Sequence, residues 1–371
     1  MKENRVKKVI DKMKEENLDQ ILVSAPSSLF YLTGKWFHPG NRMIVLLIKS
    51  NGDHKLINNK LFPVNEDLGV DIVWYEDTDN PTEVLSKYID NTSNLGIDKT
   101  WPSHYLIELM ELNAAKEYKN SSVIIDELRM IKEAEEIEFM KEASKINDKT
   151  MKELWGHLKE GMTELECVVL LKELYEKNGS NKFSFSPIIA FCPNGADPHH
   201  ETDDTRLKIG DSIVIDIGCV YNDYCSDMTR TVFFGKVPSN KHESIYSIVK
   251  EANERAIEAV KPGVKFSDID KAAREYITEN GYGEYFTHRT GHCIGIDCHD
   301  FGDVSGVNDK VLEPGMIFSV EPGVYLKDDF GVRIEDLVLV TKDGHEVLNC
   351  VSKEVTVIKY FKIKKKIIYK F

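Results

Sequence analysis

The chain has 371 residues, of which 42% are hydrophobic and 30% are charged, and its formal net charge is -14. This length predicts two or three domains, because a single hydrophobic core stops growing at about 250 to 300 residues. The acidic balance argues against nucleic-acid binding, which needs clustered Lys and Arg, and no run approaches the roughly 18 apolar residues of a membrane helix.

The first third of the chain alternates helical and strand-like segments. Residues 2–18 place apolar side chains at helical spacing and lack the apolar core and cleavage site of a signal peptide, so we expect a cytoplasmic protein. Further helices are predicted over 82–90 and 103–113. Strands are predicted over 20–23, 42–49, 71–74 and 94–97. This alternation indicates an α/β domain, which we assign to residues 1–128.

A second domain is predicted over residues 129–371. It opens with a polar helix over 132–159, and Thr163 with Glu166 forms a capping box for the next helix, which Gly179 ends. Strand-like runs then come in two pairs, 212–220 with 223–234 and 315–326 with 331–341. Helices are predicted between these pairs, over 239–260 and 268–280. Paired strands with segregated helices predict an α+β domain, and the two similar units hint at an internal duplication.

The seven cysteines are odd in number, and no two are spaced C-x-x-C. This pattern argues against a disulfide framework and against a thiolate zinc site. Free thiols are typical of a reducing cytosol. The one basic cluster, residues 362–366, is interpreted as a solvated tail.

An acidic residue interrupts an apolar strand at Asp216, within the run Ser-Ile-Val-Ile-Asp-Ile-Gly. A lone buried carboxylate costs several kcal/mol unless a charge or hydrogen bonds compensate it. Asp227 lies in the next strand, and a turn at Tyr221 and Asn222 would place it opposite Asp216. We therefore expect both carboxylates on one face of a hairpin, with a cation between them.

The second strand pair repeats this arrangement. Glu321 follows the apolar run over 317–320, and Glu335 lies on the returning strand. A turn centred on Asp328 would set Glu321 opposite Glu335. Each of the two hairpins is therefore predicted to present a facing pair of acidic side chains.

Four carboxylates in strands rich in Ile and Val need more positive charge than nearby side chains offer. For any one acid alone, an arginine partner or exposure to solvent is the better explanation, and Arg230 and Arg333 can pair with one each. His292 offers an imidazole, with small residues beside it and with His288 and His299 within a dozen positions. Four carboxylates with one imidazole suit two divalent ions about 3.5–4 Å apart.

Two other groups of residues lie near these motifs in the sequence. His199 and His200 follow Pro198, and the pattern supports an exposed loop and a functional role about equally. Cys293 and Cys298 lie close to the histidines, but the carboxylate-rich set already suits two hard ions. We interpret both cysteines as small buried packing residues.

The order Asp216, Asp227, His292, Glu321, Glu335 resembles that of the pita-bread metallopeptidases, which include methionine aminopeptidase, aminopeptidase P and prolidase. The resemblance is carried by residues 194–200, 216–218, 226–231, 288–295, 321–325 and 331–336. The N-terminal third resembles the extra domain of the proline-specific branch that includes creatinase. The chain as a whole is most similar to bacterial Xaa-Pro dipeptidases and short Xaa-Pro aminopeptidases. This resemblance implies a curved antiparallel sheet with outer helices and a pseudo-two-fold, beside a smaller N-terminal α/β domain.

The resemblance also implies metal-binding roles. Asp227 and Glu335 would bridge two divalent ions, Asp216 would chelate one of them, and His292 with Glu321 would hold the other. Mn is the expected metal, with Co, Zn or Fe as alternatives that the same ligands accept. A homodimer is a further implication.

The same comparison implies a substrate site. It would be lined by His199, His288 and His299, with Arg333 near the bridging glutamate. The family often has Gly after the ligand His and Glu after the second His, where this chain has Cys293 and Asp300. The implied substrate is a small peptide with proline at its second position.

These residues support a hypothesis for the reaction. A metal-bridging hydroxide would attack the Xaa-Pro carbonyl, Glu321 would take the proton, and His299 would help polarise the carbonyl. The expected activity is that of an Xaa-Pro dipeptidase (prolidase). An Xaa-Pro aminopeptidase that acts on longer peptides is one alternative, and a non-catalytic creatinase-like binding protein is another. The chain has no Walker A loop, no G-x-G-x-x-G after a strand and no H-E-x-x-H, which argues against nucleotide-binding and single-zinc enzymes of those kinds.

Overall fold

The computed structural model describes residues 1–359, so the basic cluster over 362–366 lies outside the described residues. The chain divides into two compact units between Arg129 and Met130. The sequence placed this junction one residue earlier, at 128 and 129. Within residues 1–359, no helix combines the length and the apolar character needed to cross a bilayer.

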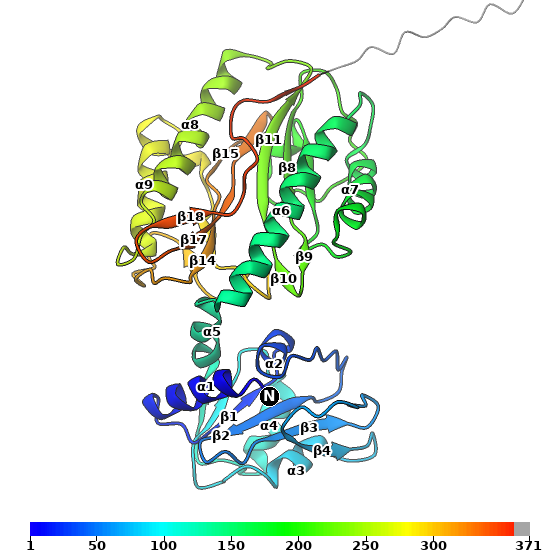
Figure 1. Cartoon of the computed structure of the whole chain (residues 1–371), viewed down its shortest axis with the longest axis vertical. Helices are drawn as coiled ribbons and strands as arrows, with labels where there is room; N and C mark the ends of the chain where they lie inside the picture. Colours follow the sequence, from blue (N-terminus) through cyan, green and yellow to red (C-terminus); the bar gives the residue numbers. More distant parts are fainter. Residues whose placement is uncertain (360–371) are drawn as a thin grey trace, which may run out of the picture. The chain divides into compact units, whose positions relative to one another are not determined.

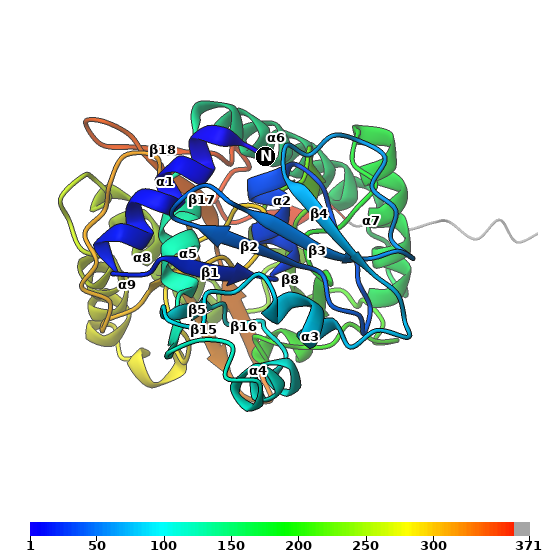
Figure 2. The ribbon, with the colours of Figure 1, turned by 90° about the horizontal axis from the view of Figure 1, so that it is seen from below.

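The first unit contains a mixed six-stranded sheet, drawn in blue and cyan in Figures 1 and 2. Its strands are β1 (Gln20–Val23), β2 (Val45–Lys49), β3 (Lys55–Asn59), β4 (Asp71–Tyr75), β5 (Leu95–Ile97) and β6 (Tyr118–Asn120). They lie in the order β4-β3-β2-β1-β5-β6. Strand β2 runs antiparallel to β1 and β3, whereas the β1–β5, β5–β6 and β3–β4 pairs are parallel.

The helices of this unit complete the predicted α/β pattern. They are α1 (Glu3–Glu15), α2 (Pro26–Thr33), α3 (Pro81–Ser86), α4 (Ser103–Glu111) and α5 (Ser122–Met130). Leu85 of α3 and Leu109 of α4 pack with Leu47 and Ile57 of the sheet in one buried core. Helix α2 and strand β3 were not predicted, because α2 has only 8 residues and β3 mixes apolar with polar side chains.

The second unit has two groups of strands, each covered by two long helices (Figure 1). The helices are α6 (Ala134–His157), α7 (Glu164–Asn178), α8 (Asn240–Glu258) and α9 (Phe266–Glu279). Leu154 of α6 and Leu171 of α7 pack in one core cluster with the strand residues Ile213 and Ile215. Helix α7 starts at the predicted capping box, and Gly179 at its end has φ 105°.

The strands of the second unit form several small sheets. They are β7 (Ile188–Phe191), β8 (Ser212–Ile217), β9 (Val220–Tyr221), β10 (Tyr224–Cys225), β11 (Met228–Phe234), β12 (Gly291–His292), β13 (Asp303–Val304), β14 (Ile317–Val320), β15 (Gly323–Leu326), β16 (Phe330–Arg333), β17 (Asp336–Val340), β18 (His345–Val347) and β19 (Val357–Ile358). Two sheets have the orders β19-β11-β8-β7 and β14-β17-β18. The pairs β9–β10, β12–β13 and β15–β16 stand apart from them. The second unit thus has the predicted α+β organisation.

Two long hairpins, each interrupted once, form the centre of this unit. In the first, β8 pairs with β11 and β9 with β10 in one continuous register around a turn at Asn222 and Asp223. In the second, β14 pairs with β17 and β15 with β16 around Asp328. Asp227 lies at the interruption of the first hairpin. Glu321 and Glu335 lie at the interruption of the second hairpin, in the gaps between β14 and β15 and between β16 and β17.

The predicted register of the first hairpin is wrong, and that of the second is confirmed. Asp216 pairs with Thr229 rather than with Asp227, because the turn lies one residue further along the chain than predicted. A shift of two residues keeps a side chain on the same face of a strand. In the second hairpin Leu326 pairs with Phe330, which centres the turn on residue 328 as expected.

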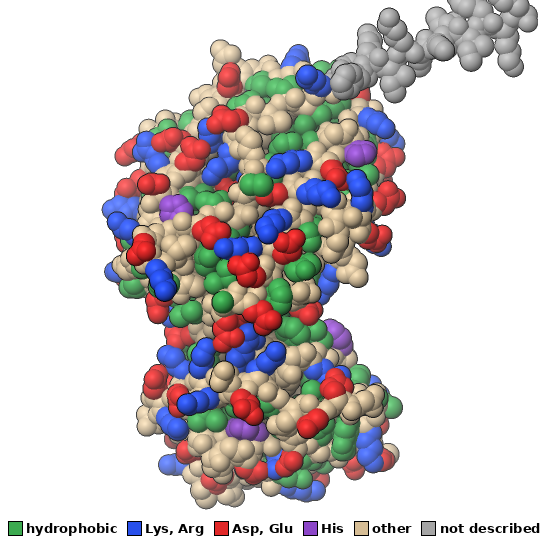
Figure 3. All heavy atoms as spheres, in the orientation of Figure 1, with side chains coloured by type: hydrophobic (Ala, Val, Ile, Leu, Met, Phe, Trp, Pro, Cys, Tyr) green, Lys and Arg blue, Asp and Glu red, His purple; other side chains and the backbone are tan. Residues whose placement is uncertain are grey.

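Acidic and basic side chains are interspersed on the face drawn in Figure 3. The chain has 62 acidic and 48 basic residues. On the described part of this face, acidic side chains lie among basic and polar side chains rather than in one block.

Candidate metal centre

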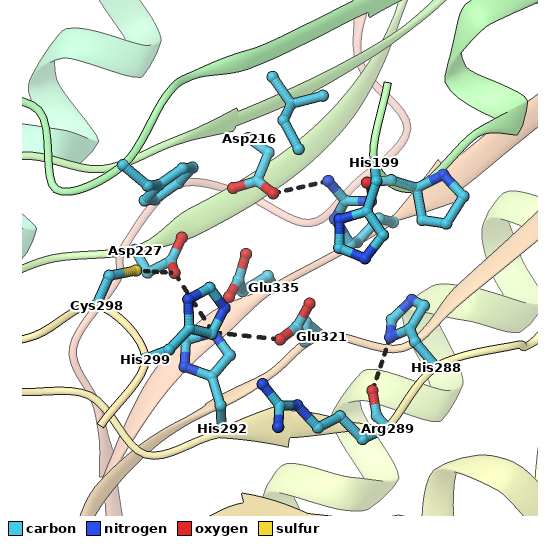
Figure 4. Close-up of a pocket in the computed structure, with 14 residues that line it drawn as sticks. His199, Asp216, Asp227, His288, Arg289, His292, Cys298, His299, Glu321 and Glu335 are labelled. Atoms are coloured by element: carbon cyan, nitrogen blue, oxygen red, sulfur yellow. Dashed lines mark hydrogen bonds and ion pairs between the residues drawn. The ribbon is translucent and has the colours of Figure 1, made fainter. Parts of the chain in front are cut away.

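A cavity of about 410 Å³ opens in the second unit where the two interrupted hairpins meet the loops around β12 (Figure 4). All nine residues that the sequence singled out line it, namely His199, Asp216, Asp227, His288, His292, His299, Glu321, Arg333 and Glu335. Phe185, Ile188, Pro198, Arg289 and Cys298 line it as well. The structure therefore gathers side chains from positions 185 to 335 around one hollow.

The acidic side chains of this cavity are withdrawn from solvent. Asp216, Asp227 and Glu335 are 8%, 4% and 1% exposed. Burial, together with the neighbouring charge of Asp216, raises the pKa of Asp227 well above its ordinary value. Burial and the charge of Asp227 do the same to the pKa of Glu335. Burial raises the pKa of Glu321 to about 7, against the opposing effect of Arg333. Carboxylates placed this way repel one another unless a cation joins them.

The donor atoms have the spacing of a metal-binding group. One ligand atom each of Asp227, His292 and Glu335 lies within 4.8 Å of the other two. His292 Nε2 is 3.6 Å from Asp227 Oδ2 and 3.5 Å from Glu321 Oε1. Within the described chain, Oδ1 of Asp216 and Oδ1 of Asp227 are buried without a hydrogen-bond partner. Buried oxygens left unpaired are costly, so the residues present fit a set of divalent metal ions.

Arg333 is the one arginine that pairs with these acids among residues 1–359. Its Nη2 lies 2.7 Å from Asp216 Oδ2, its Nε donates to Thr229 Oγ1 at 3.1 Å and its Nη1 donates to Tyr325 Oη at 3.0 Å. Arg230 pairs instead with Asp336, which does not line the cavity. One guanidinium cannot balance four carboxylates, so the charge excess predicted from the sequence is present in the structure.

Hydroxyl groups hold two of the carboxylates in place. Thr229 Oγ1 donates to Glu335 Oε2 at 2.7 Å, and Ser319 Oγ donates to Glu321 Oε1 at 3.1 Å. Ser319 Oγ also accepts a hydrogen bond from the backbone N–H of His292 at 3.0 Å. The strands approach so closely here that a Cβ on Gly291 would lie 1.9 Å from the Ser319 carbonyl oxygen. This contact explains why a glycine precedes His292.

Three imidazoles of the cavity, those of His288, His292 and His299, have lowered pKa values. Burial and the charge of Arg333 lower the pKa of His288 to about 4. Burial and His299 lower the pKa of His292 to about 3, and partial burial with Arg289 lowers the pKa of His299. His288 Nε2 lies 2.9 Å from Tyr325 Oη. A neutral imidazole can bind a metal ion through one nitrogen and donate or accept a proton with the other.

The structure separates the two neighbouring histidines that the sequence left open. His199 lines the cavity, whereas His200 Nε2 contacts Glu164 Oε2 at 2.7 Å in a different part of the loop. The buried Glu164 carboxylate also accepts hydrogen bonds from the backbone N–H groups of Phe191 and Asp203, at 2.7 and 3.0 Å. This network anchors the loop that carries His199. Glu164 was missed in the sequence because it reads there as an ordinary first-turn acid of α7.

Cys298 and Arg289 were not predicted to belong to the site. Cys293 is buried in a hydrophobic core cluster, as expected. The interpretation of Cys298 as a packing residue is wrong, because its side chain lines the cavity and its Sγ donates to Asp227 Oδ2 at 3.4 Å. Burial and the charge of Asp227 raise the pKa of the Cys298 thiol well above its usual range. In the sequence, neither residue type nor spacing distinguishes Cys298, which lines the cavity, from Cys293, which does not.

Comparisons with known proteins agree with this geometry. Residues 138–342 match the model of metallopeptidase family M24, and residues 5–131 match that of the creatinase/prolidase N-terminal domain. An uncharacterized peptidase of Staphylococcus aureus (strain USA300) is 37% identical over 357 residues, which cover 94% of this chain and 99% of the relative. The prolidase from Pyrococcus horikoshii OT3 has a TM-score of 0.87 at 33% identity, covering 95% of this chain and 99% of its own. The Xaa-Pro dipeptidase from Bacillus anthracis has a TM-score of 0.87 at 32% identity, covering 96% and 100%.

Proposed function

The chain belongs to metallopeptidase family M24, and from this premise we propose that it is an Xaa-Pro dipeptidase that works with two divalent metal ions. It has the pita-bread fold of that family and a creatinase-type N-terminal domain. The observation that carries the proposal is the convergence of four carboxylates and His292 on one cavity with an apolar wall. The similarity to solved prolidases supports the choice of substrate.

The proposed metal ligands are the four carboxylates and the imidazole that line the same cavity. Asp227 and Glu335 would hold both ions, Asp216 would hold one, and His292 with Glu321 would hold the other. Bound divalent ions lower the pKa of a water molecule and polarise a carbonyl oxygen. The unpartnered oxygens of Asp216 and Asp227 support this assignment, since both side chains line the cavity and each has one buried oxygen without a hydrogen bond. Mn²⁺ is our choice of working ion, because hard carboxylate oxygens dominate the set.

The remaining side chains of the cavity have separable roles. Glu321 Oε1, oriented by Ser319, would accept the proton of the attacking water. His299, neutral at pH 7, would donate a hydrogen bond to the oxygen of the scissile carbonyl as its charge develops. His199 and His288 would bind the substrate carboxylate or assist the leaving nitrogen. Each role needs a group within about 3 Å of a reacting atom, which the cavity dimensions permit.

Proline recognition follows from the apolar wall of the same cavity. This wall is formed by three uncharged, apolar side chains, those of Phe185, Ile188 and Pro198. The nitrogen of an Xaa-Pro bond has no N–H, so a peptidase that relies on a hydrogen bond from that nitrogen loses it. A pocket that buries the pyrrolidine ring gains hydrophobic free energy instead.

We extend the proposal to the cellular setting. All seven cysteines are free thiols, which supports a reducing cytoplasm. A homodimer is proposed on the sequence resemblance alone.

The test of the proposed function is a substrate panel with metal-free protein reloaded with Mn²⁺, Co²⁺ or Zn²⁺. We expect cleavage of Gly-Pro and Ala-Pro, and little cleavage of Gly-Ala, which lacks the ring. Release of proline is measured directly by amino-acid analysis. Failure to cleave any Xaa-Pro dipeptide with any of the three ions would contradict the assignment.

One feature favours an Xaa-Pro aminopeptidase as a second candidate. A further hollow of about 760 Å³ shares Phe185, Ile188 and His199 with the metal cavity. The chain of a longer peptide could continue past these three residues into it. Faster cleavage of Arg-Pro-Pro than of Arg-Pro would select this candidate, and the reverse order would select the dipeptidase.

His199 provides a prediction specific to substrate binding. His199→Ala is expected to lower kcat/KM on Xaa-Pro dipeptides by about 10²- to 10³-fold, because it removes one polar donor from the reacting centre. The bound metal should stay the same, since His199 is not among the ligands. Metal analysis and steady-state kinetics on the same sample check both parts. His157→Ala, at the exposed end of α6, is the matched control and should leave kcat/KM unchanged. A loss of metal in His199→Ala would show that its role is wrongly assigned.

A further inference from the structure

A thiol faces the metal ligands of this chain. Cys298 is the one cysteine that lines the cavity within residues 1–359, and its Sγ donates to Asp227 Oδ2 at 3.4 Å (Figure 4). His292 Nε2 approaches the same carboxylate oxygen at 3.6 Å. Sulfur and imidazole nitrogen therefore converge on one carboxylate oxygen.

Each of these two separations matches the distance between two donors bound to one ion. Zinc lies about 2.3 Å from a thiolate sulfur and about 2.0–2.2 Å from nitrogen and carboxylate oxygen. At a tetrahedral angle, a sulfur and an oxygen on one ion are therefore about 3.6 Å apart, and a nitrogen and an oxygen about 3.4 Å. The observed distances of 3.4 Å for sulfur to oxygen and 3.6 Å for nitrogen to oxygen agree with both.

A second observation at the same place indicates a ligand. Asp227 is 4% exposed, and its other oxygen, Oδ1, has no hydrogen-bond partner within residues 1–359. The thiol thus donates to one oxygen of a cavity-lining carboxylate whose other oxygen has no hydrogen bond. A cation placed there would satisfy the carboxylate and meet the sulfur at the same time.

We propose that Cys298 is a conditional sulfur ligand of this metal centre, recruited by thiophilic divalent ions such as Zn²⁺ and Co²⁺ and left unused by Mn²⁺. The inference rests on the proposed metal centre and adds a ligand to it. The step forms one sulfur–metal bond and breaks the S–H bond, and the proton leaves to solvent. Soft sulfur donors favour Zn²⁺ and Co²⁺ over Mn²⁺, which prefers oxygen. Cys298 would therefore strengthen the binding of thiophilic ions selectively.

Cobalt absorption tests the proposal without reference to turnover. The full chain is stripped of metal and titrated with Co²⁺. Visible d–d bands report that the ion is bound, and a near-ultraviolet sulfur-to-cobalt charge-transfer band reports a thiolate ligand. We expect both in the wild type, and only the d–d bands in Cys298→Ser, which is nearly isosteric. Cys350→Ser, which removes an exposed thiol, is the matched control and should keep both.

Affinity measurements give the second readout. In Cys298→Ser, Zn²⁺ affinity should fall by about 10- to 100-fold and Mn²⁺ affinity by less than about twofold. Wild-type d–d bands without the charge-transfer band would overturn the role of Cys298 while leaving the metal centre intact. A charge-transfer band that persists in Cys298→Ser would overturn it as well. Absence of every cobalt band from the wild type would instead refute the metal centre, and the proposed function with it.

Discussion

Asp227→Asn is expected to abolish both metal binding and peptidase activity, with kcat/KM falling by at least about 10⁴-fold. Asp227 Oδ2 lies 3.6 Å from His292 Nε2, and Asp227 has a ligand atom within 4.8 Å of one of Glu335. A neutral amide cannot supply the anionic oxygens that the two proposed dications would share. Elemental analysis of the purified protein and turnover of Gly-Pro are the measurements.

The same substitution has the opposite effect on the metal-free protein. Burial and Asp216 raise the pKa of Asp227 well above its usual value, so a charge at this position destabilises the folded state when no cation is bound. Asp227→Asn removes that charge and should raise the melting temperature of metal-free protein by about 2–4 °C for each kcal/mol gained. Added Mn²⁺ should then stabilise the wild type and leave the variant unchanged.

A surface acid serves as the control for both effects. Asp329 forms an exposed ion pair with Lys241 at 2.7 Å, which contributes at most about 1 kcal/mol. Asp329→Asn should keep metal content, turnover and metal-dependent stabilisation. Full activity of Asp227→Asn on Xaa-Pro dipeptides would contradict the whole assignment of the site.

Arg230→Met is expected to destabilise the folded protein by about 3–5 kcal/mol, the largest stability effect among our predictions. Arg230 is 1% exposed, and its Nη2 pairs with Asp336 Oδ1 at 2.5 Å. Its Nη1 donates to the Glu335 carbonyl oxygen at 2.6 Å, and its Nη2 donates to the Val351 carbonyl oxygen at 2.8 Å. Loss of the guanidinium removes its donors from a buried carboxylate and from three carbonyl groups, those of Thr229, Glu335 and Val351. Urea denaturation measures the change in unfolding free energy.

A double-mutant cycle separates the ion pair from the backbone contacts. Asp336→Asn in the Arg230→Met background removes a buried charge that has lost its arginine partner and keeps only its second ion pair, with Lys353 Nζ at 3.1 Å. The double variant should therefore be more stable than the two single effects predict when added, by at least about 1 kcal/mol. Arg255→Met, which breaks an exposed pair with Glu251, is the control and should cost less than about 1 kcal/mol. Strict additivity of Arg230→Met and Asp336→Asn would show that the buried pair is not energetically coupled.

Arg230 also connects stability to the site. The Arg230 guanidinium donates a hydrogen bond to the backbone carbonyl of Glu335, a proposed metal ligand. Loss of Arg230 should therefore make the backbone at Glu335 less well ordered. The sequence suggested that Arg230 and Arg333 would each pair with one of the four site acids. Arg333 does so with Asp216, whereas Arg230 pairs with Asp336, next to Glu335 in the chain.

Much of the fold could be predicted, because its signals are local. The capping box at Thr163 and Glu166 placed the start of α7, and the turn around residue 328 placed the second hairpin in its correct register. The turn of the first hairpin was predicted at Tyr221 and Asn222, one residue before its position in the structure. Asn222 and Asp223 both adopt positive φ in that turn, at 45° and 67°, and a sequence with two Asx residues after a tyrosine does not state which two form the turn.

The sequence by itself pointed to the four acids and to His292 as one group. Asp216 interrupts an apolar strand, the two predicted turns set the other acids near it in facing pairs, and His292 lies among small residues with two further histidines close by. Only the tertiary structure decided which of His199 and His200 faces the cavity, and that Cys298 lies against Asp227 across 71 positions of chain. It likewise placed Thr229 against Glu335 across 106 positions. The physical reason is that the pattern of apolar and polar residues is a property of one segment, whereas a hydrogen bond between distant loops exists only once both loops have been packed in place.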